Sequence, residues 1–139
     1  MDSLSPISRS RNMSRIKSKN TKPEMKVRKY LFSLGYRYRI HYPIYGRPDV
    51  VFLNKKIALF IHGCFWHGHK NCKEAHFPKS NINFWSTKIN NNIERDNENL
   101  IKLRKDKWTV LVIWECELEK ELHKTLQKLN KRLSLINPS

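Results

Sequence analysis

The order of hydrophobic patterns along the chain predicts an α/β (α+β) fold with a mixed central sheet. A helical pattern comes first, three short strand-like runs follow, and a long helical pattern separates them from a last strand and a closing helix. The long helix gives a crossover of sufficient length for the last strand to pair in parallel. At 139 residues, the chain is long enough for one domain with a real core, and we expect residues 21–139 to form it.

The first helix is predicted to begin at Thr21. Thr21 and Glu24 match a capping box, and Pro23 suits the first turn of a helix. Apolar residues then recur at helical spacing until Gly35, which is typical of a helix end.

The remaining elements follow from composition and periodicity. The second and third strands are continuous apolar runs joined by a short polar turn, so we expect a hairpin buried on both faces. The long helix and the closing helix each show apolar residues on one face. The expected strands cover residues 36–42, 49–53, 57–61 and 109–114, and the expected helices cover residues 80–105 and 118–133.

The charge of the chain indicates a polyanionic partner. There are 28 Lys and Arg residues against 12 acidic ones, which gives a formal net charge of +16. Nucleic acid is the usual partner of such a protein. No apolar run is long enough to span a bilayer, and the start of the chain does not resemble a signal peptide. Three cysteines, an odd number, fit a reduced compartment, so we expect a cytoplasmic protein. We also expect a monomer without a membrane partner.

Residues 1–20 are basic and rich in serine, with few large apolar side chains. We interpret them as a flexible basic arm that contacts DNA phosphates. The alternative is a disordered tail without a role in binding.

Residues 61–72, IHGCFWHGHKNC, contain a predicted metal site. Cys64, His69 and Cys72 offer thiolate and imidazole ligands, which suit tetrahedral zinc. Cys116, after the last strand, and His76, four residues beyond Cys72, are both candidates for the fourth ligand. A site closed by four protein ligands would be structural.

His62 and His67 are not needed for zinc and are candidates for catalysis. Asp49 follows Pro48 at the start of a predicted strand, which the predicted hairpin places beside the strand that ends near His62. Phosphodiester hydrolysis requires an activated water and charge neutralisation, which Mg²⁺ on a carboxylate provides, and histidine can move the proton. The alternative is that the histidines are packed side chains and that the Pro-Asp pair belongs to a turn.

Phe65 and Trp66 lie between these histidines, with Trp85 near the start of the long helix. Apolar side chains pushed between base pairs unstack DNA, at a cost that is least at a mismatch. We therefore interpret Phe65 and Trp66 as a wedge. Trp85 is also explained as a core residue on the helical face that carries Ile89.

The αβββαβ order is the common core of restriction-endonuclease-like nucleases. Short sequence motifs indicate one family within this group. The chain resembles the very-short-patch-repair (Vsr) mismatch endonucleases of bacteria. The motifs are RNM (11–13), TKPE (21–24), GRPD (46–49), HGCFWH (62–67), FW (84–85), NNIERD (91–96) and WEC (114–116). The chain departs from the family by having two residues, where one is expected, between His69 and Cys72.

This resemblance implies roles for the candidate catalytic residues. Asp49 and a backbone carbonyl near Ile61 would hold the catalytic Mg²⁺. Glu24 would pair with His62, and Asp96 would pair with His67. For the structural zinc site, the resemblance selects Cys116 as the fourth ligand.

The resemblance also implies a substrate. Met13, Lys88 and Asn92 would contact the mismatched pair, and the enzyme would nick one strand of duplex DNA at T:G mismatches left by deamination of 5-methylcytosine. The resemblance further implies a functional link to a DNA cytosine methyltransferase. It also implies that this protein acts in the bacterial cytoplasm, in association with the nucleoid. Two alternatives are a non-catalytic zinc-bearing DNA-binding protein and a His-Asn-His nuclease built on His62, His67 and Asn71, which would leave Asp49 without a role.

Overall fold

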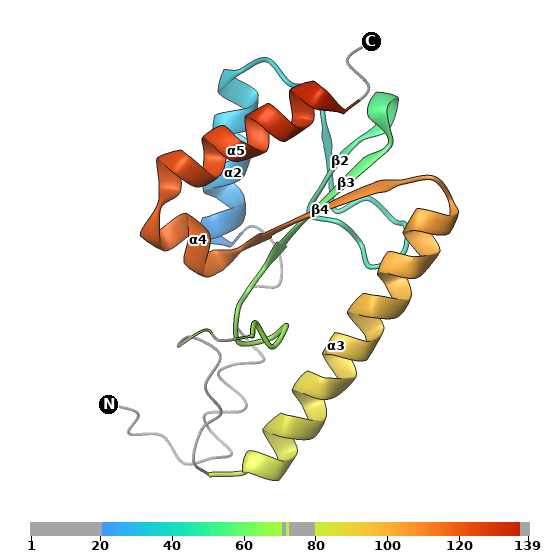
Figure 1. Cartoon of the computed structure of the whole chain (residues 1–139), viewed down its shortest axis with the longest axis vertical. Coiled ribbons are helices and arrows are strands. Elements are labelled where there is room, and N and C mark those ends of the chain that lie inside the picture. Colours follow the sequence, from blue (N-terminus) through green and yellow to red (C-terminus); the bar gives the residue numbers. More distant parts are fainter. Residues whose placement is uncertain (1–20, 71, 73–79, 137–139) are drawn as a thin grey trace.

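Four strands form one sheet in the order β1–β2–β3–β4 in the computed structural model, which describes residues 21–70, 72 and 80–136 (Figure 1). The predicted arm at residues 1–20 lies outside the described residues. The helices are α2 (Lys22–Ser33), the short 3-10 helix η1 (Leu53–Lys55), α3 (Ile82–Lys105), α4 (Glu115–Lys120) and α5 (Leu122–Leu135). The strands are β1 (Arg39–Ile40), β2 (Val50–Phe52), β3 (Ile57–His62) and β4 (Thr109–Trp114).

The sheet is mixed, as predicted. β1 pairs with β2 and β2 with β3 in antiparallel orientation, with Val50 opposite Leu59. β3 and β4 are parallel, from the pair Ile57–Thr109 to the pair His62–Trp114. The connection between them is α3, the long crossover that parallel pairing requires.

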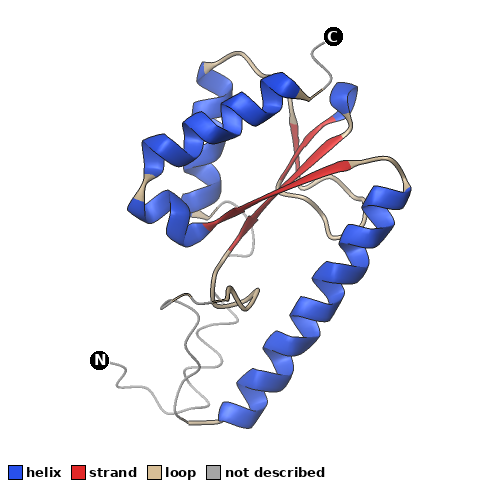
Figure 2. Cartoon of the chain, in the orientation of Figure 1, coloured by secondary structure: helices blue, strands red, loops and turns tan. Residues whose placement is uncertain are grey.

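Helices cover both faces of the sheet, which explains why β2 and β3 are apolar on both sides. α2, α4 and α5 lie on one face and α3 on the other (Figure 2). Side chains alternate along β3: Ile57 and Leu59 join the larger core with α2 and α5, whereas Ala58 joins the smaller core with Leu103 of α3. His62 shares the face of Ala58, which directs its side chain toward α3.

Three local predictions were wrong. The strand expected at 36–42 is reduced to Arg39–Ile40, because His41 adopts a left-handed conformation with φ of 48° that ends the extended chain. Leu53 leaves the predicted strand and starts η1. The closing helix begins earlier than predicted and is two helices, α4 and α5, separated at Glu121, whose ψ of 65° is not helical.

The topology brings several polar residues to one edge of the sheet. β2 runs antiparallel to β3, so the start of β2 lies beside the end of β3, and the end of the parallel strand β4 lies there too. Asp49, His62 and Cys116 occupy these three positions. Among the described residues, no helix has an apolar stretch that would reach across a lipid bilayer.

Candidate active site

Asp49 is anchored at the start of β2 by the neighbouring strand. Its Oδ2 accepts a hydrogen bond of 2.6 Å from the backbone N–H of Ile61. Potential ligand atoms of Asp49, Glu24 and His41 all lie within 4.8 Å of one another. The sequence predicted Asp49 and Glu24 as site residues, and the structure brings them together.

Glu24 is buried at the N-terminus of α2, where its backbone N–H donates to Thr21 Oγ1 at 3.4 Å, as the capping box predicts. Its Oε2 accepts a hydrogen bond of 2.9 Å from Arg28 and lies 3.2 Å from His41 Nε2. In the structure, the histidine in contact with this carboxylate is His41, whereas the pairing of Glu24 with His62 stays a prediction. His41 does not stand out in the sequence, because residues 36–42 show the pattern of an ordinary strand.

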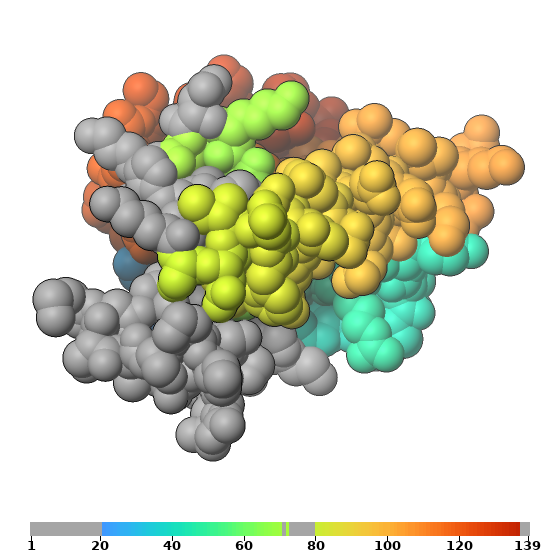
Figure 3. Space-filling view, turned by 90° about the horizontal axis from the view of Figure 1, so that it is seen from below, coloured from blue at the N-terminus to red at the C-terminus, as the bar shows by residue number. Residues whose placement is uncertain are grey.

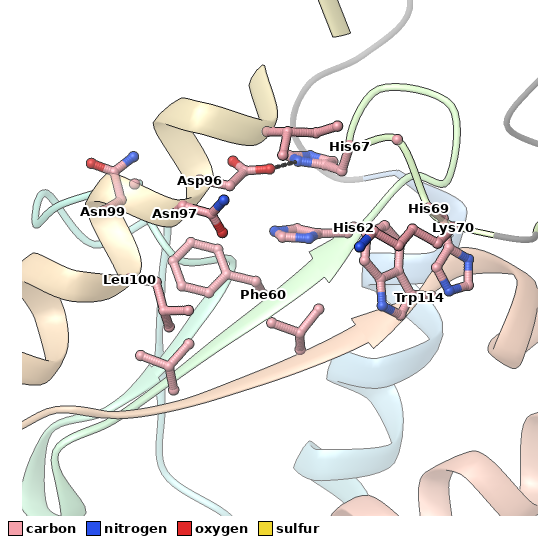
Figure 4. Close-up of a pocket in the computed structure, with 15 residues that line it drawn as sticks. Phe60, His62, His67, His69, Lys70, Asp96, Asn97, Asn99, Leu100 and Trp114 are labelled. Atoms are coloured by element: carbon pink, nitrogen blue, oxygen red, sulfur yellow. Dashed lines mark hydrogen bonds and ion pairs between the residues drawn. The ribbon is translucent and has the colours of Figure 1, made fainter. Parts of the chain in front are cut away.

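The predicted contact between His67 and Asp96 is present. His67 Nδ1 lies 2.6 Å from Asp96 Oδ2, which α3 carries over the end of β3 (Figure 4). The rings of His62 and His67 stack in parallel, with centroids 3.8 Å apart. His62 Nδ1 is buried and has no hydrogen-bond partner among the described residues. The stack lines a cavity of about 500 Å³ between α3 and the sheet.

Burial sets the protonation of two of these groups. Burial raises the pKa of Asp49 to about 7; the Ile61 N–H opposes the increase, and the nearby Glu24 carboxylate adds to it. Burial, together with a smaller contribution from the charge on His67, lowers the pKa of His62 to about 4. His62 is therefore neutral at physiological pH, and a cation beside Asp49 would relieve the cost of its buried charge.

Cys64, His69, Cys72 and Cys116 form the predicted metal cluster, with ligand atoms within 4.8 Å of one another. Cys116 Sγ lies 3.4 Å from His69 Nδ1, close to the roughly 3.6 Å that tetrahedral zinc imposes between sulfur and nitrogen ligands. His69 stacks on Trp114 at 4.0 Å, which orients its ring. Burial raises the pKa of Cys64 to about 12, so a metal must displace the thiol proton. The rival ligand His76 lies outside the described residues.

An aromatic cluster lies next to the histidines. Phe65 and Trp66 contact Trp85 of α3, with ring centroids 5.4 and 6.1 Å apart. Asn92 Nδ2 donates to the Trp66 carbonyl at 2.9 Å, and Lys88 Nζ lies 5.8 Å from the centre of the Trp66 ring. Trp85 is buried, as its core interpretation predicted, whereas Phe65 and Trp66 are partly exposed.

The structure thus gathers five of the six predicted DNA-contacting residues around α3, whose first turns run across the face in Figure 3. Met13, the sixth, lies outside the described residues.

Comparison with known proteins identifies the family. The family model described as DNA mismatch endonuclease Vsr matches residues 1–74. The chain is 44% identical over 140 residues to the type II nicking enzyme V.XorIIP of Xanthomonas oryzae pv. oryzae, covering 99% of this chain and 98% of the relative. This chain belongs to the Vsr family. It is 36% identical over 126 residues to the DNA mismatch endonuclease Vsr of Escherichia coli, covering 90% of this chain and 80% of that protein.

A solved structure supports the fold independently. The catalytic domain of the homing endonuclease I-Bth0305I matches with a TM-score of 0.54 and 23% identity, covering 81% of this chain and 93% of that domain. The fold is the predicted restriction-endonuclease-like core, and the Vsr-family chain is a DNA endonuclease.

Proposed function

We propose that this Vsr-family endonuclease nicks one strand of duplex DNA at T:G mismatches, by Mg²⁺-dependent hydrolysis of a phosphodiester bond. The observation that carries the proposal is the position of Trp66, which directly precedes His67 in a loop held against α3. An aromatic wedge and a proton-transfer group are therefore rigidly coupled. Such coupling would direct the cut to a position beside the distorted base step.

The chemical roles follow from the contacts. Asp96 binds Nδ1 of His67, which leaves Nε2 to exchange a proton with the attacking water or the leaving oxygen. His62 is neutral and stacks beneath His67, so it supports the ring without competing for the proton. Asp49, with a backbone carbonyl near Ile61 as the family resemblance implies, would hold Mg²⁺. When bound, Mg²⁺ would neutralise phosphate charge and acidify water.

In this proposal, the aromatic cluster of Phe65, Trp66 and Trp85 recognises the mismatch. Phe65 and Trp66 would enter an opened base step, which costs about a few kcal/mol to unstack and least at a mismatch. Trp85 supports the wedge from behind through its buried contacts. Lys88 and Asn92 hold Trp66 from α3 and, with Met13, would meet the mismatched pair.

Two further parts of the proposal concern zinc and the arm. Zn²⁺ is the ion best suited to Cys64, His69, Cys72 and Cys116, because two or more thiolates with imidazole in a tetrahedral set are typical of structural zinc. Residues 1–20 would contact phosphates. Each phosphate neutralised contributes about −0.9 to the slope of log affinity against log salt, so deleting residues 1–19 should reduce that slope; an unchanged slope would contradict a role in binding.

The biological setting is part of the same proposal. T:G mismatches arise where 5-methylcytosine deaminates, so the enzyme would act in cells that contain a DNA cytosine methyltransferase. It would act as a monomer on cytoplasmic, nucleoid-associated DNA.

One assay tests the function. Zinc-loaded enzyme is mixed with end-labelled duplexes that differ only in a T:G or a C:G pair, with Mg²⁺ present or omitted. We expect a single nick beside the mismatched thymine, only in the T:G duplex and only with Mg²⁺. Equal cutting of both duplexes would contradict mismatch repair, and binding without cutting would favour the non-catalytic alternative.

A further inference from the structure

His41 contacts the site but has no role in the mechanism described above. It comes from the end of β1, and its backbone N–H donates to the Asp49 carbonyl at 3.3 Å. This bond fixes His41 beside Asp49 at the edge of the sheet. Its ring is directed at Glu24, with Nε2 3.2 Å from Oε2.

The spacing of these atoms fits a metal ion as well as a hydrogen bond. Two ligands at right angles on an octahedral ion, each about 2.1 Å away, lie about 3.0 Å apart, and opposite ligands lie about 4.2 Å apart. His41 Nε2 and Glu24 Oε2 are 3.2 Å apart, and the three groups Glu24, His41 and Asp49 fall within 4.8 Å. The protein therefore brings one nitrogen and two carboxylate donors within 4.8 Å of one another, close to the spacing that a shared ion requires.

The surrounding charge also fits a divalent cation. Glu24 is 2% exposed and Asp49 lies beside it, so two carboxylates meet in a poorly solvated site. Arg28 Nη2 lies 2.9 Å from Glu24 Oε2 and compensates part of this negative charge. A carboxylate has about four lone-pair positions, so Glu24 can bind Arg28 and a metal ion together.

We propose that Glu24, His41 and Asp49 together bind one divalent cation, which makes His41 a metal ligand and favours Mn²⁺ over Mg²⁺. The proposal rests on the metal dependence of the proposed function and enlarges the ligand set beyond Asp49 and the Ile61 carbonyl. An imidazole ligand shifts preference from Mg²⁺ toward transition metals, because Mg²⁺ prefers oxygen ligands alone. A DNA phosphate would add further oxygen ligands and negative charge for the cation.

Mn²⁺ bound to the zinc-loaded, full-length protein without DNA provides a direct test. Electron paramagnetic resonance counts bound Mn²⁺, and electron spin echo modulation detects a directly bound imidazole nitrogen. We expect nitrogen modulation in the wild type and its loss in His41→Gln, with Mn²⁺ affinity reduced by roughly 10–100-fold or more. His67→Ala is the matched control and should keep both the modulation and the affinity.

The results of this experiment distinguish a failure of the proposed ligand set from a failure of the proposed mismatch-nicking function. Wild-type Mn²⁺ without nitrogen modulation would overturn the ligand set and leave His41 as a hydrogen-bond donor to Glu24. Modulation that survives in His41→Gln but disappears in His67→Ala would also overturn it, because the ion would then sit on the stacked histidines. Neither spectrum depends on cleavage, so a failure to nick T:G duplexes would overturn the proposed function while this ligand set still stood.

Discussion

Asp49 lies in the candidate active site, in surroundings that disfavour the ionised form of its carboxyl group. One oxygen accepts the Ile61 N–H, yet burial and the Glu24 carboxylate raise its pKa to about 7 from an ordinary 3.8. Because the folded-state pKa is the higher one, ionised Asp49 opposes folding. This cost is absent below about pH 4, grows as the pH rises, and is complete above about pH 7. A bound cation would offset it.

Asp49→Asn should therefore gain stability as it loses activity. Nicking should be abolished, because the amide is a poor metal ligand, while mismatch binding remains. In zinc-loaded protein without added Mg²⁺ at pH 8, thermal unfolding should occur at a higher temperature than in the wild type. The advantage should vanish at pH 4, where wild-type Asp49 is protonated. A wild-type rate of nicking in the variant would refute the proposed active site.

His67→Ala tests the proton-transfer group separately. Loss of general acid-base catalysis should slow single-turnover nicking by roughly 10²–10⁴-fold, with little change in affinity for the T:G duplex. Asp96→Asn keeps the ring but alters its partner, so it should give a smaller decrease. If both variants lost binding and kept the rate of the bound complex, His67 would be a recognition residue instead.

The sequence indicated which residues belong to this site more reliably than it indicated which of their side chains contact one another. The His67–Asp96 contact could be inferred from family motifs, because NNIERD lies on a helix that must pass over β3. The partner of Glu24 could not, since the left-handed turn at His41 depends on the chain leaving β1 toward Asp49. The left-handed backbone of His41 thus accompanies a contact between its ring and Glu24 that no sequence pattern indicated.

At the scale of elements, the contact between the loop after β3 and α3 is close at Gly68. Gly68 has φ of 59°, and a Cβ there would lie 2.6 Å from Ile93 Cδ1 and 2.9 Å from Ile89 Cγ2. The absence of a side chain lets the loop lie on the helix. This packing fixes His67 and the aromatic pair relative to Asp96.

Gly68→Ala should lower the free energy of unfolding by roughly 1–3 kcal/mol through overpacking. It should also reduce the preference for T:G over matched duplex, because the loop must move away from α3. Gly63→Ala is the matched control: its Cβ would meet only Trp66 Cδ1, at an ordinary 3.7 Å. Denaturant unfolding measures the stability of each variant, and nicking assays on T:G and matched duplexes measure its preference for the mismatch. Equal effects of the two substitutions would mean that contact with α3 is unimportant.

For the whole molecule, topology explains how residues distant in sequence form one site. The order of strands and helices was predictable from hydrophobic runs, and it alone brings the start of β2 and the ends of β3 and β4 to one edge. Element boundaries were less predictable. α4 begins immediately after β4 because the Trp114 N–H is capped by Glu117 Oε1 at 3.0 Å, and this early start places Cys116 within reach of His69.

Zinc should therefore connect the loop after β3, which carries Cys64 and His69, to α4, which carries Cys116 directly after β4. Cys116 and Cys64 are both buried, and Cys116 Sγ lies 3.4 Å from His69 Nδ1. Cys116→Ser should lose most of the one zinc ion expected per chain. It should also lose stability on the order of several kcal/mol, since the binding energy of a structural zinc ion contributes to folding. Metal analysis and thermal unfolding measure the two effects.

His76→Ala distinguishes the two candidate fourth ligands. If Cys116 completes the site, His76→Ala should keep full zinc and unfold at the wild-type temperature. T:G nicking should likewise persist in His76→Ala but fall in Cys116→Ser, because an unanchored loop no longer presents Trp66 and His67 together. Full zinc occupancy in Cys116→Ser, with loss in His76→Ala, would transfer the fourth position to His76 and remove the link between the loop and β4.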